Sequence, residues 1–135
     1  MVNLVLISHG SLAAGIREAA EMILGEQENL IVLGLYPGDT VDSFSQKLEK
    51  AVDSLGSSEN VLVLTDIPSG TPANAANRMV LQKNMRYLSG CNLPMLLEVL
   101  SDRRDETMDE LVRLAIECGK DGIVDSKDLL ARLDG

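Results

Sequence analysis

The segment Met1–Ser11, MVNLVLISHGS, decides the fold of this chain. Val2–Ile7 is a nearly continuous apolar run, typical of a strand that is buried on both faces of a parallel sheet. His9-Gly10 follows this run and leads into a helical pattern, so the only histidine of the chain stands at a strand tip. In open α/β sheets ligands bind at the carboxyl ends of the strands. His9 is therefore a candidate functional residue, and a structural, hydrogen-bonded histidine is the alternative.

Length and composition indicate a single packed domain over residues 1–135. The core is expected to be aliphatic, because 45% of the residues are hydrophobic and only 2% are aromatic. No apolar run reaches the roughly 18–20 residues of a membrane span, and the N-terminus lacks the features of a signal peptide. Cys91 and Cys118 lie far apart, as expected for reduced thiols. These features predict a cytoplasmic protein.

The charge of the chain bears on its partners. A formal net charge of −9 disfavours nucleic acid as a ligand, because proteins that bind nucleic acid present basic patches. The same charge suits docking with a neutral or basic protein. We therefore expect a protein partner and no nucleic acid.

Strand-like and helix-like patterns alternate along the chain after His9. Further strands are predicted at Leu30–Leu35, Val61–Thr65 and Met85–Leu88, with a short fifth strand at Ile123-Val124. Helices are predicted from Ser11 to Gly25, over 41–55 with Asp39 or Thr40 as cap, over Pro72–Gln82, over 94–100, from Thr107 and from Ser126. This alternation predicts an α/β protein with helices on both faces of a mainly parallel sheet, in the strand order 2-1-3-4.

All strands of a parallel sheet end at the same edge, so residues far apart in the sequence meet there. Pro37-Gly38, Asp66 and the segment Gly90–Asn92 are predicted to join His9 at this edge. If the first and third strands are neighbours, His9 faces Asp66. A carboxylate fixes the tautomer of an imidazole and leaves its other nitrogen available as a base, a metal ligand or a nucleophile.

The chain lacks the motifs of metal sites, serine hydrolases and nucleotide-binding proteins, which leaves fewer possible reactions for His9. One histidine with scattered carboxylates is a poor set of metal ligands, so no metal is expected. The serine-hydrolase motif G-x-S-x-G is absent, as are the nucleotide-binding motifs G-x-x-x-x-G-K-[ST] and G-x-G-x-x-G. A nucleophilic histidine remains, and its expected electrophile is a phosphoryl group supplied by another protein. No cofactor is expected.

Two helix starts at this edge offer backbone N–H groups for phosphoryl oxygens. One is Gly10-Ser11, and the other is Gly70-Thr71. Gly10, Ser11 and Gly70 are therefore the expected phosphoryl-binding residues. The Thr71 hydroxyl is expected to contact the His9–Asp66 pair or a phosphoryl oxygen, in addition to capping its own helix.

Several short motifs occur in order along nearly the whole chain. They are His9-Gly10, Leu24-Gly25-Glu26-Gln27, Pro37-Gly38, Asp66 followed by Gly70-Thr71-Pro72 with Asn74 and Ala75, and the run from Gly90-Cys91-Asn92 through Leu93-Pro94-Met95 to Glu98. Together these motifs make the sequence similar to the IIA component of the mannose/fructose/sorbose-family sugar permeases in the phosphoenolpyruvate-dependent phosphotransferase system.

The resemblance implies a phosphotransferase role, as a component of a protein-Nπ-phosphohistidine–sugar phosphotransferase. His9 would accept a phosphoryl group from phospho-HPr and pass it to a histidine of a IIB component, which serves the membrane components IIC and IID. Asp66 would match the acidic partner of the histidine. Thr71 would match the hydroxyl of the family's Gly-Gly-Ser/Thr-Pro loop.

The resemblance also implies a homodimer in which a C-terminal strand, here Ile123-Val124, is exchanged between subunits. Two positions depart from the family pattern, because Ser69 replaces the first loop glycine and Ala73 replaces an aromatic residue that often follows the proline. Both departures bear on loop geometry and partner choice. The chain ends at Gly135 with no IIB domain, so IIB is expected to be a separate polypeptide.

Other functions stay open on the sequence. A phosphotransfer subunit of a phosphoenolpyruvate-dependent dihydroxyacetone kinase would use His9 in the same way, and a regulatory phospho-accepting module would not pass the group on. A tetrapyrrole metal chelatase would need a second histidine, which the chain does not contain. A receiver domain would need an acidic cluster after the first strand, where Ile7-Ser8-His9 stands.

Overall fold

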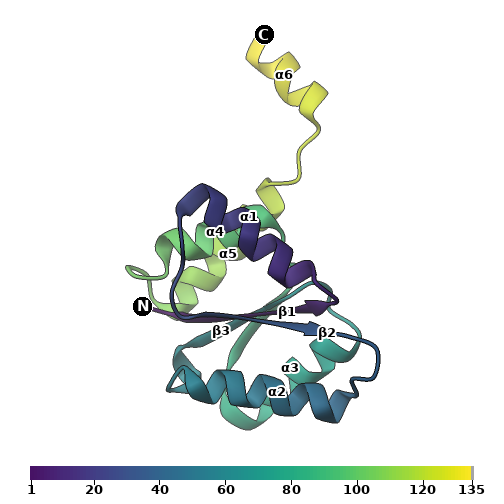
Figure 1. Cartoon of the computed structure of the whole chain (residues 1–135). Coiled ribbons are helices and arrows are strands. Elements are labelled where there is room, and N and C mark those ends of the chain that lie inside the picture. Colours follow the sequence, from purple (N-terminus) through teal and green to yellow (C-terminus); the bar gives the residue numbers. More distant parts are fainter. Residues whose placement is uncertain (135) are drawn as a thin grey trace.

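The first strand lies inside a parallel sheet that has helices on both sides. The computed structural model describes residues 1–134, in which four strands pair in the order β2-β1-β3-β4, all parallel. The strands are β1 (Asn3–His9), β2 (Leu30–Leu35), β3 (Val61–Thr65) and β4 (Arg86–Ser89). Figure 1 shows this sheet between two helical layers. The predicted fold class and strand order are confirmed.

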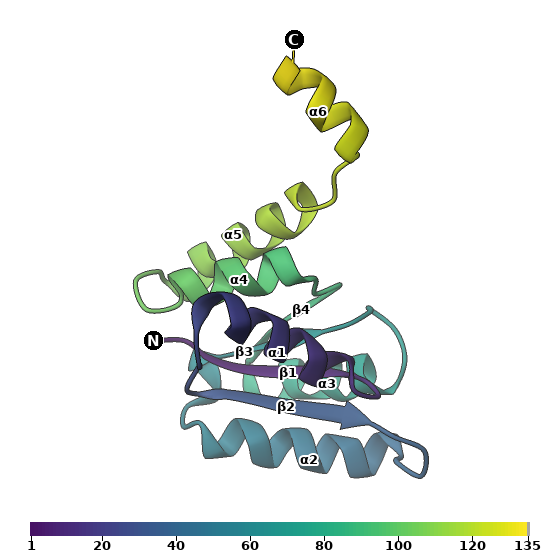
Figure 2. The same cartoon turned by 45° about the horizontal axis from the view of Figure 1, so that its top comes forward.

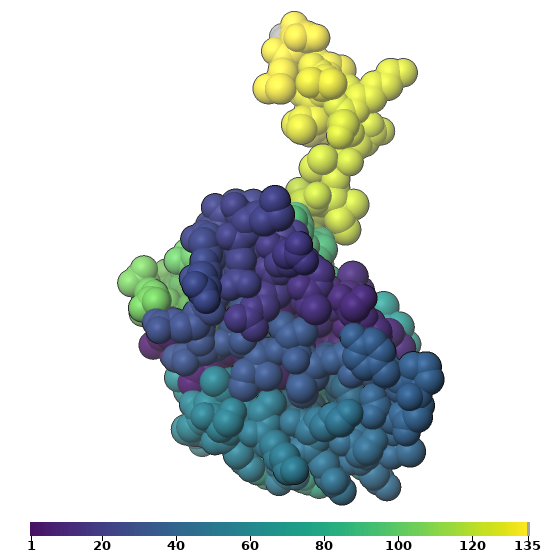
Figure 3. Space-filling view, viewed as in Figure 1, coloured from purple at the N-terminus to yellow at the C-terminus, as the bar shows by residue number. Residues whose placement is uncertain are grey.

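The helices divide between the two faces of the sheet (Figure 2). One face carries α1 (Leu12–Leu24), α4 (Leu93–Asp102) and α5 (Met108–Asp121), and the other carries α2 (Val41–Ser54) and α3 (Thr71–Lys83). The 3-10 turn η1 (Ser58–Asn60) leads into β3. The last helix, α6 (Ser126–Asp134), has no buried residue and stands clear of the rest of the surface in Figure 3. No helix in residues 1–134 has the length and apolar character to cross a membrane.

Alternate residues of β1 enter two separate cores. Leu4 and Leu6 pack in the core that includes residues of α1, α4 and α5, whereas Val5 and Ile7 pack in the core that includes residues of α2 and α3. All four side chains are buried. Because successive side chains of a strand point to opposite faces, a strand covered on both faces needs apolar residues at every position. This requirement explains the continuous apolar run at the start of the chain.

The predicted fifth strand is absent from the connection between α5 and α6. Ile123 and Val124 form no strand pairing within residues 1–134, and their exposed fractions are 78% and 55%. A strand is stable only where it pairs with a neighbouring strand, and this segment pairs with neither edge strand, β2 or β4. Exchange of the segment with a second chain stays a prediction.

Arg103, which follows α4, joins the amino-terminal edge of the sheet to the loop before β2. The residue is only 1% exposed. Its guanidinium donates to the carbonyl oxygens of Val2, Glu28 and Asn29 at 3.4, 2.6 and 3.2 Å. A fourth hydrogen bond, of 3.2 Å, reaches the side-chain oxygen of Gln27. One buried cation therefore satisfies four neutral acceptors that local sequence patterns do not connect.

Replacing Arg103 by methionine is expected to lower the free energy of unfolding by about 2–4 kcal/mol, because the four acceptors around this buried guanidinium would lose their donor. Chemical denaturation measures the change. The matched control is Arg104→Met, because the Arg104 side chain is 64% exposed and pairs with Glu28 on the surface. The control is expected to change stability by less than about 0.5 kcal/mol. Equal effects of the two substitutions would contradict the assigned role of Arg103.

Candidate functional site

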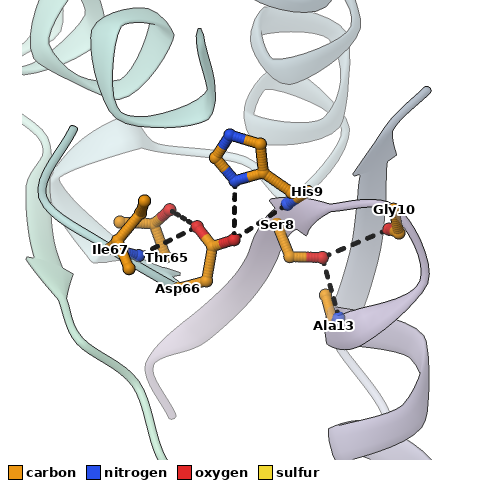
Figure 4. A network of polar contacts seen from close by, with 7 residues as sticks. All are labelled: Ser8, His9, Gly10, Ala13, Thr65, Asp66 and Ile67. Carbon is orange, nitrogen blue, oxygen red and sulfur yellow. Dashed lines mark hydrogen bonds and ion pairs between the residues drawn. The ribbon is translucent and has the colours of Figure 1, made fainter. Parts of the chain in front are cut away.

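His9 and Asp66 meet at the carboxyl edge of the sheet, where β1 and β3 end (Figure 4). Oδ2 of Asp66 accepts the backbone N–H of His9 at 2.9 Å and lies 2.8 Å from Nδ1 of the His9 ring. An ionised carboxylate only accepts hydrogen bonds, so Nδ1 carries the proton of the neutral ring. The other ring nitrogen, Nε2, keeps its lone pair. The predicted juxtaposition of His9 and Asp66 is present in the structure.

Hydrogen bonds keep the Asp66 carboxylate ionised. Its second oxygen, Oδ1, accepts from the backbone N–H of Ile67 at 2.9 Å and from the hydroxyl of Thr65 at 3.1 Å. Burial raises the pKa of Asp66, but hydrogen bonds from His9, Ile67 and Thr65 outweigh it and hold the pKa below its ordinary value of 3.8. Asp66 is therefore a fixed negative charge beside the imidazole at neutral pH.

The ring of His9 lies against the backbone of Gly70. The side chain of His9 is 47% exposed. A Cβ atom added to Gly70 would lie 3.0 Å from both Cε1 and Nε2 of the ring, and Gly70 has a φ of +94°. Gly70 immediately precedes α3 and provides no side-chain cap for that helix. Nε2 therefore lies beside an uncapped helix N-terminus, which favours an anionic group.

Thr71 is the first residue of α3, so the prediction that it caps the helix is wrong. The cap position belongs to Gly70, and Pro72 occupies the first turn, where its missing N–H is tolerated. Within residues 1–134 the hydrogen-bond donors to the Asp66 carboxylate are His9, Thr65 and Ile67. The predicted contact of Thr71 with the histidine–carboxylate pair is therefore not formed. A contact with a phosphoryl oxygen stays a prediction.

The helix start at Gly10-Ser11 is stabilised by a residue of the preceding strand. The hydroxyl of Ser8 accepts from the backbone N–H of Ala13 at 2.8 Å and donates to the Gly10 carbonyl at 3.3 Å. Ser11 occupies the cap position but makes no side-chain cap hydrogen bond. The helix thus starts where the sequence predicts, but the Ser11 hydroxyl does not cap it. The sequence hides the true cap because Ser8 belongs to β1.

Gly10 is arranged poorly for the predicted phosphoryl-binding role. Its backbone N–H donates to the Leu35 carbonyl at 2.8 Å, so this donor already has a partner. Figure 4 shows the His9 ring turned away from Gly10 and Ala13. Among the three predicted phosphoryl-binding residues, Gly70 is the one found in contact distance of the ring.

The remaining segments predicted at this edge support the fold. Gly38 has a φ of +98° in the turn after β2. The backbone N–H of Cys91 donates to the Thr65 carbonyl at 2.9 Å, and burial raises the pKa of the Cys91 thiol to about 12. Asn92 caps α4 by accepting from the Met95 N–H at 3.0 Å. Gly38 thus forms the turn after β2, and Cys91 and Asn92 fix the loop after β4.

Residues 1–134 contain no cluster of three or more His, Cys, Asp or Glu side chains that could hold a metal ion. A small pocket lies behind the histidine–carboxylate pair, and its lining residues include Ser8, Leu12, Ala13, Ile16, Thr65, Asp66 and Cys91. The site is thus an exposed histidine with a half-buried carboxylate beside it.

A histidine beside a fixed carboxylate and an uncapped helix N-terminus, at the carboxyl edge of a doubly covered parallel sheet, places the chain in the class of α/β domains that carry their site at this edge. The family model described as "PTS system fructose IIA component" matches residues 3–116. The chain belongs to this family, and the predicted resemblance is confirmed.

Individual relatives agree with this assignment. The chain is 38% identical over 124 residues to the mannose-specific EIIAB component of the PTS of Escherichia coli (strain K12), covering 90% of this chain and 38% of that protein. It is 34% identical to the fructose-specific EIIA component of Bacillus subtilis (strain 168), covering 83% of this chain and 77% of that protein. The chain therefore spans well under half the length of its Escherichia coli relative.

A solved structure shows the same similarity in three dimensions. The crystal structure of the phosphotransferase system component EIIA from Streptococcus agalactiae superposes with a TM-score of 0.87 at 32% sequence identity. The match covers 95% of this chain and 99% of that chain. The similarity thus extends over almost all of both chains.

Replacing Ser8 by alanine is expected to lower the free energy of unfolding by about 1 kcal/mol, as for loss of a helix cap. The matched control is Ser11→Ala, which removes a hydroxyl at the formal cap position that makes no cap hydrogen bond. It is expected to leave stability nearly unchanged. Urea denaturation of both variants measures the difference, and a larger loss for Ser11→Ala would show that the cap is wrongly assigned.

Proposed function

We propose that this chain is a phosphocarrier of a sugar phosphotransferase system and that His9 accepts the phosphoryl group. The observation that carries the proposal is the His9 ring, whose Nδ1 lies 2.8 Å from Oδ2 of Asp66 while Nε2 lies toward Gly70. Membership in the IIA family supports this function. The relatives described above are named as components specific for sugars, so the dihydroxyacetone-kinase alternative receives no support.

The proposed reaction is an in-line transfer between two imidazoles. The Nε2 lone pair of His9 attacks the phosphorus of a phosphohistidine on the donor protein. A new N–P bond forms, the N–P bond to the donor breaks, and the donor ring keeps that electron pair. Positive charge develops on the His9 ring as the bond forms, and the ionised carboxylate of Asp66 stabilises it through the Nδ1 proton. Transfer to an acceptor histidine reverses these steps and returns a neutral His9.

The N-terminus of α3 is the proposed site for the phosphoryl oxygens. Gly70 leaves room beside Nε2, and the first-turn N–H groups of α3 have no side-chain cap. Thr71 stands at the first position of this helix, where its hydroxyl is the proposed additional donor. The two departures from the family pattern differ in setting, because Ser69 is exposed on the loop and Ala73 is buried. We therefore assign any effect on partner choice to Ser69.

The proposed partners are phospho-HPr as donor and a IIB component as acceptor, with IIC and IID served indirectly. Exposed apolar side chains at the same edge of the sheet support a protein partner. Leu12, Tyr36 and Ile67 are 57%, 52% and 47% exposed and come from three separate loops or helix starts. A cytoplasmic location and a homodimer belong to the same proposal.

Incubation with phosphoenolpyruvate, enzyme I and HPr is expected to add one acid-labile phosphoryl group to each chain. Intact-mass spectrometry measures the addition. The His9→Ala variant is expected to gain nothing, because the chain contains no other histidine. If the wild-type protein stays unmodified while HPr is phosphorylated, the phosphocarrier function is wrong. Later addition of a IIB component tests onward transfer and separates a carrier from a regulatory acceptor.

The Gly70→Ala variant is expected to accept the phosphoryl group at least about tenfold more slowly, because the added methyl group crowds Nε2. Gly25→Ala is the matched control. Gly25 has nearly the same conformation, with a φ of +90° against +94° at Gly70, but an added Cβ meets no atom within 4 Å. Both variants therefore carry similar backbone strain. Equal rates of phosphorylation in the two variants would contradict the assigned access path.

A further inference from the structure

We propose that Thr65 is a positioning residue, whose hydroxyl holds the Asp66 carboxylate in the rotation that presents Oδ2 to both N–H groups of His9. The inference deepens the proposed function. It depends on that function only where rates of phosphoryl transfer are measured.

The contact joins a buried hydroxyl to the half-buried Asp66 carboxylate. Thr65 is the last residue of β3 and is 0% exposed. Its hydroxyl donates to Oδ1 of Asp66 at 3.1 Å, and this oxygen also accepts the N–H of Ile67 at 2.9 Å. A buried hydroxyl is costly without an acceptor, so the Thr65 side chain and the carboxylate orient each other.

The two oxygens of Asp66 have separate tasks. Oδ2 receives both donors of His9, at 2.9 and 2.8 Å, and Oδ1 receives the donors of Thr65 and Ile67. Because a carboxylate is planar, fixing Oδ1 also fixes the direction of Oδ2. The hydrogen bonds to Oδ1 therefore also determine whether Oδ2 points at Nδ1 of His9.

Thr65 is the more rigid of the two donors to Oδ1. It pairs with Ile7 of β1 on one side and with Ser89 of β4 on the other. Ile67 lies on the exposed loop after the strand and is itself 47% exposed. The sheet thus anchors the carboxylate through Thr65, whereas the other donor belongs to a segment with fewer neighbours.

Packing alone does not require a hydroxyl at position 65. The other four residues of β3 are Val61, Leu62, Val63 and Leu64, and all of them are buried. Valine has the same branched shape as threonine and suits a buried strand equally well. The hydroxyl is the one polar side chain of this strand, and its partner is the carboxylate of the candidate site.

Loss of the hydroxyl therefore has a defined consequence. The carboxylate would lose one of its four hydrogen bonds, its rotation would be less restricted, and the pKa of Asp66 would rise. The ring of His9 would then populate the Nε2–H tautomer more often. In that tautomer the nitrogen proposed to attack phosphorus carries a proton instead of a lone pair.

The test compares wild type, Thr65→Val and Thr65→Ser by nitrogen NMR of the imidazole. The chain contains a single histidine, so the ring signals need no assignment. Wild type and Thr65→Ser are expected to hold mainly the Nδ1–H tautomer. Thr65→Val is expected to lower the ratio of Nδ1–H to Nε2–H by about three- to tenfold, and to raise the pKa of Asp66 in a carbon-detected titration.

Rates of phosphorylation by phospho-HPr provide the functional measurement. Thr65→Val is expected to react about three- to tenfold more slowly and Thr65→Ser at a rate close to wild type. Ser45→Ala is the control, because the Ser45 hydroxyl oxygen is buried on α2 and has no hydrogen-bond partner among the described residues. Its tautomer ratio and rate are expected to match wild type.

Several outcomes would overturn the role of Thr65. An unchanged tautomer ratio and unchanged Asp66 pKa in folded Thr65→Val would do so, and so would a Thr65→Ser variant that behaves like Thr65→Val. If Thr65→Val does not fold, Thr65→Ala and Thr65→Ser replace it as the pair, because both lack the methyl group and differ only in the hydroxyl. If the wild type accepts no phosphoryl group, the proposed function fails, while the NMR comparison still decides the role of Thr65.

Discussion

The parallel pairing of β1 with β3 is the interaction on which the candidate site depends. Its register places Ile7 opposite Thr65. Asp66 directly follows Thr65, and His9 lies two residues beyond Ile7. Just beyond this last pair, the Asp66 side chain accepts the backbone N–H of His9. A shift of one residue in either strand would turn the reacting side chains to opposite faces of the sheet. The buried apolar run of β1 therefore sets the geometry of the chemistry as well as the fold.

The two cores determine which way the polar residues at the strand tip point. Continuing the alternation of β1, Ser8 contacts the start of α1 and His9 lies against the start of α3. Two successive residues of the same strand therefore act at the N-termini of two different helices. The serine satisfies the N-terminus of α1, and the histidine lies beside an N-terminus that has no cap of its own. One helix start is closed by protein groups, and the other stays available to an anion.

The sequence predicts those features that depend on local pattern or on parallel topology. The strands, their order and the meeting of His9 with Asp66 all follow from apolar runs and from the common edge of a parallel sheet. Three features could not be predicted in this way: the cap of α1, the four acceptors of Arg103 and the hydrogen bond of the Thr65 hydroxyl to Asp66. Their partners are set by side-chain direction and by contacts between distant segments, which no local pattern encodes. The fifth strand is not formed within the described residues, because Ile123 and Val124 pair with neither edge strand, and its exchange with a second chain stays a prediction.

The two halves of the reactive pair are separated by 57 positions, and this separation has a consequence for biosynthesis. Joining them closes a long loop that contains α1, β2, α2 and η1, so the pair forms only once β3 has paired with β1. A nascent or partly unfolded chain carries His9 near its N-terminus as an ordinary imidazole, without the carboxylate that sets its tautomer. The histidine–carboxylate pair therefore exists only in chains whose two central strands, β1 and β3, have already paired.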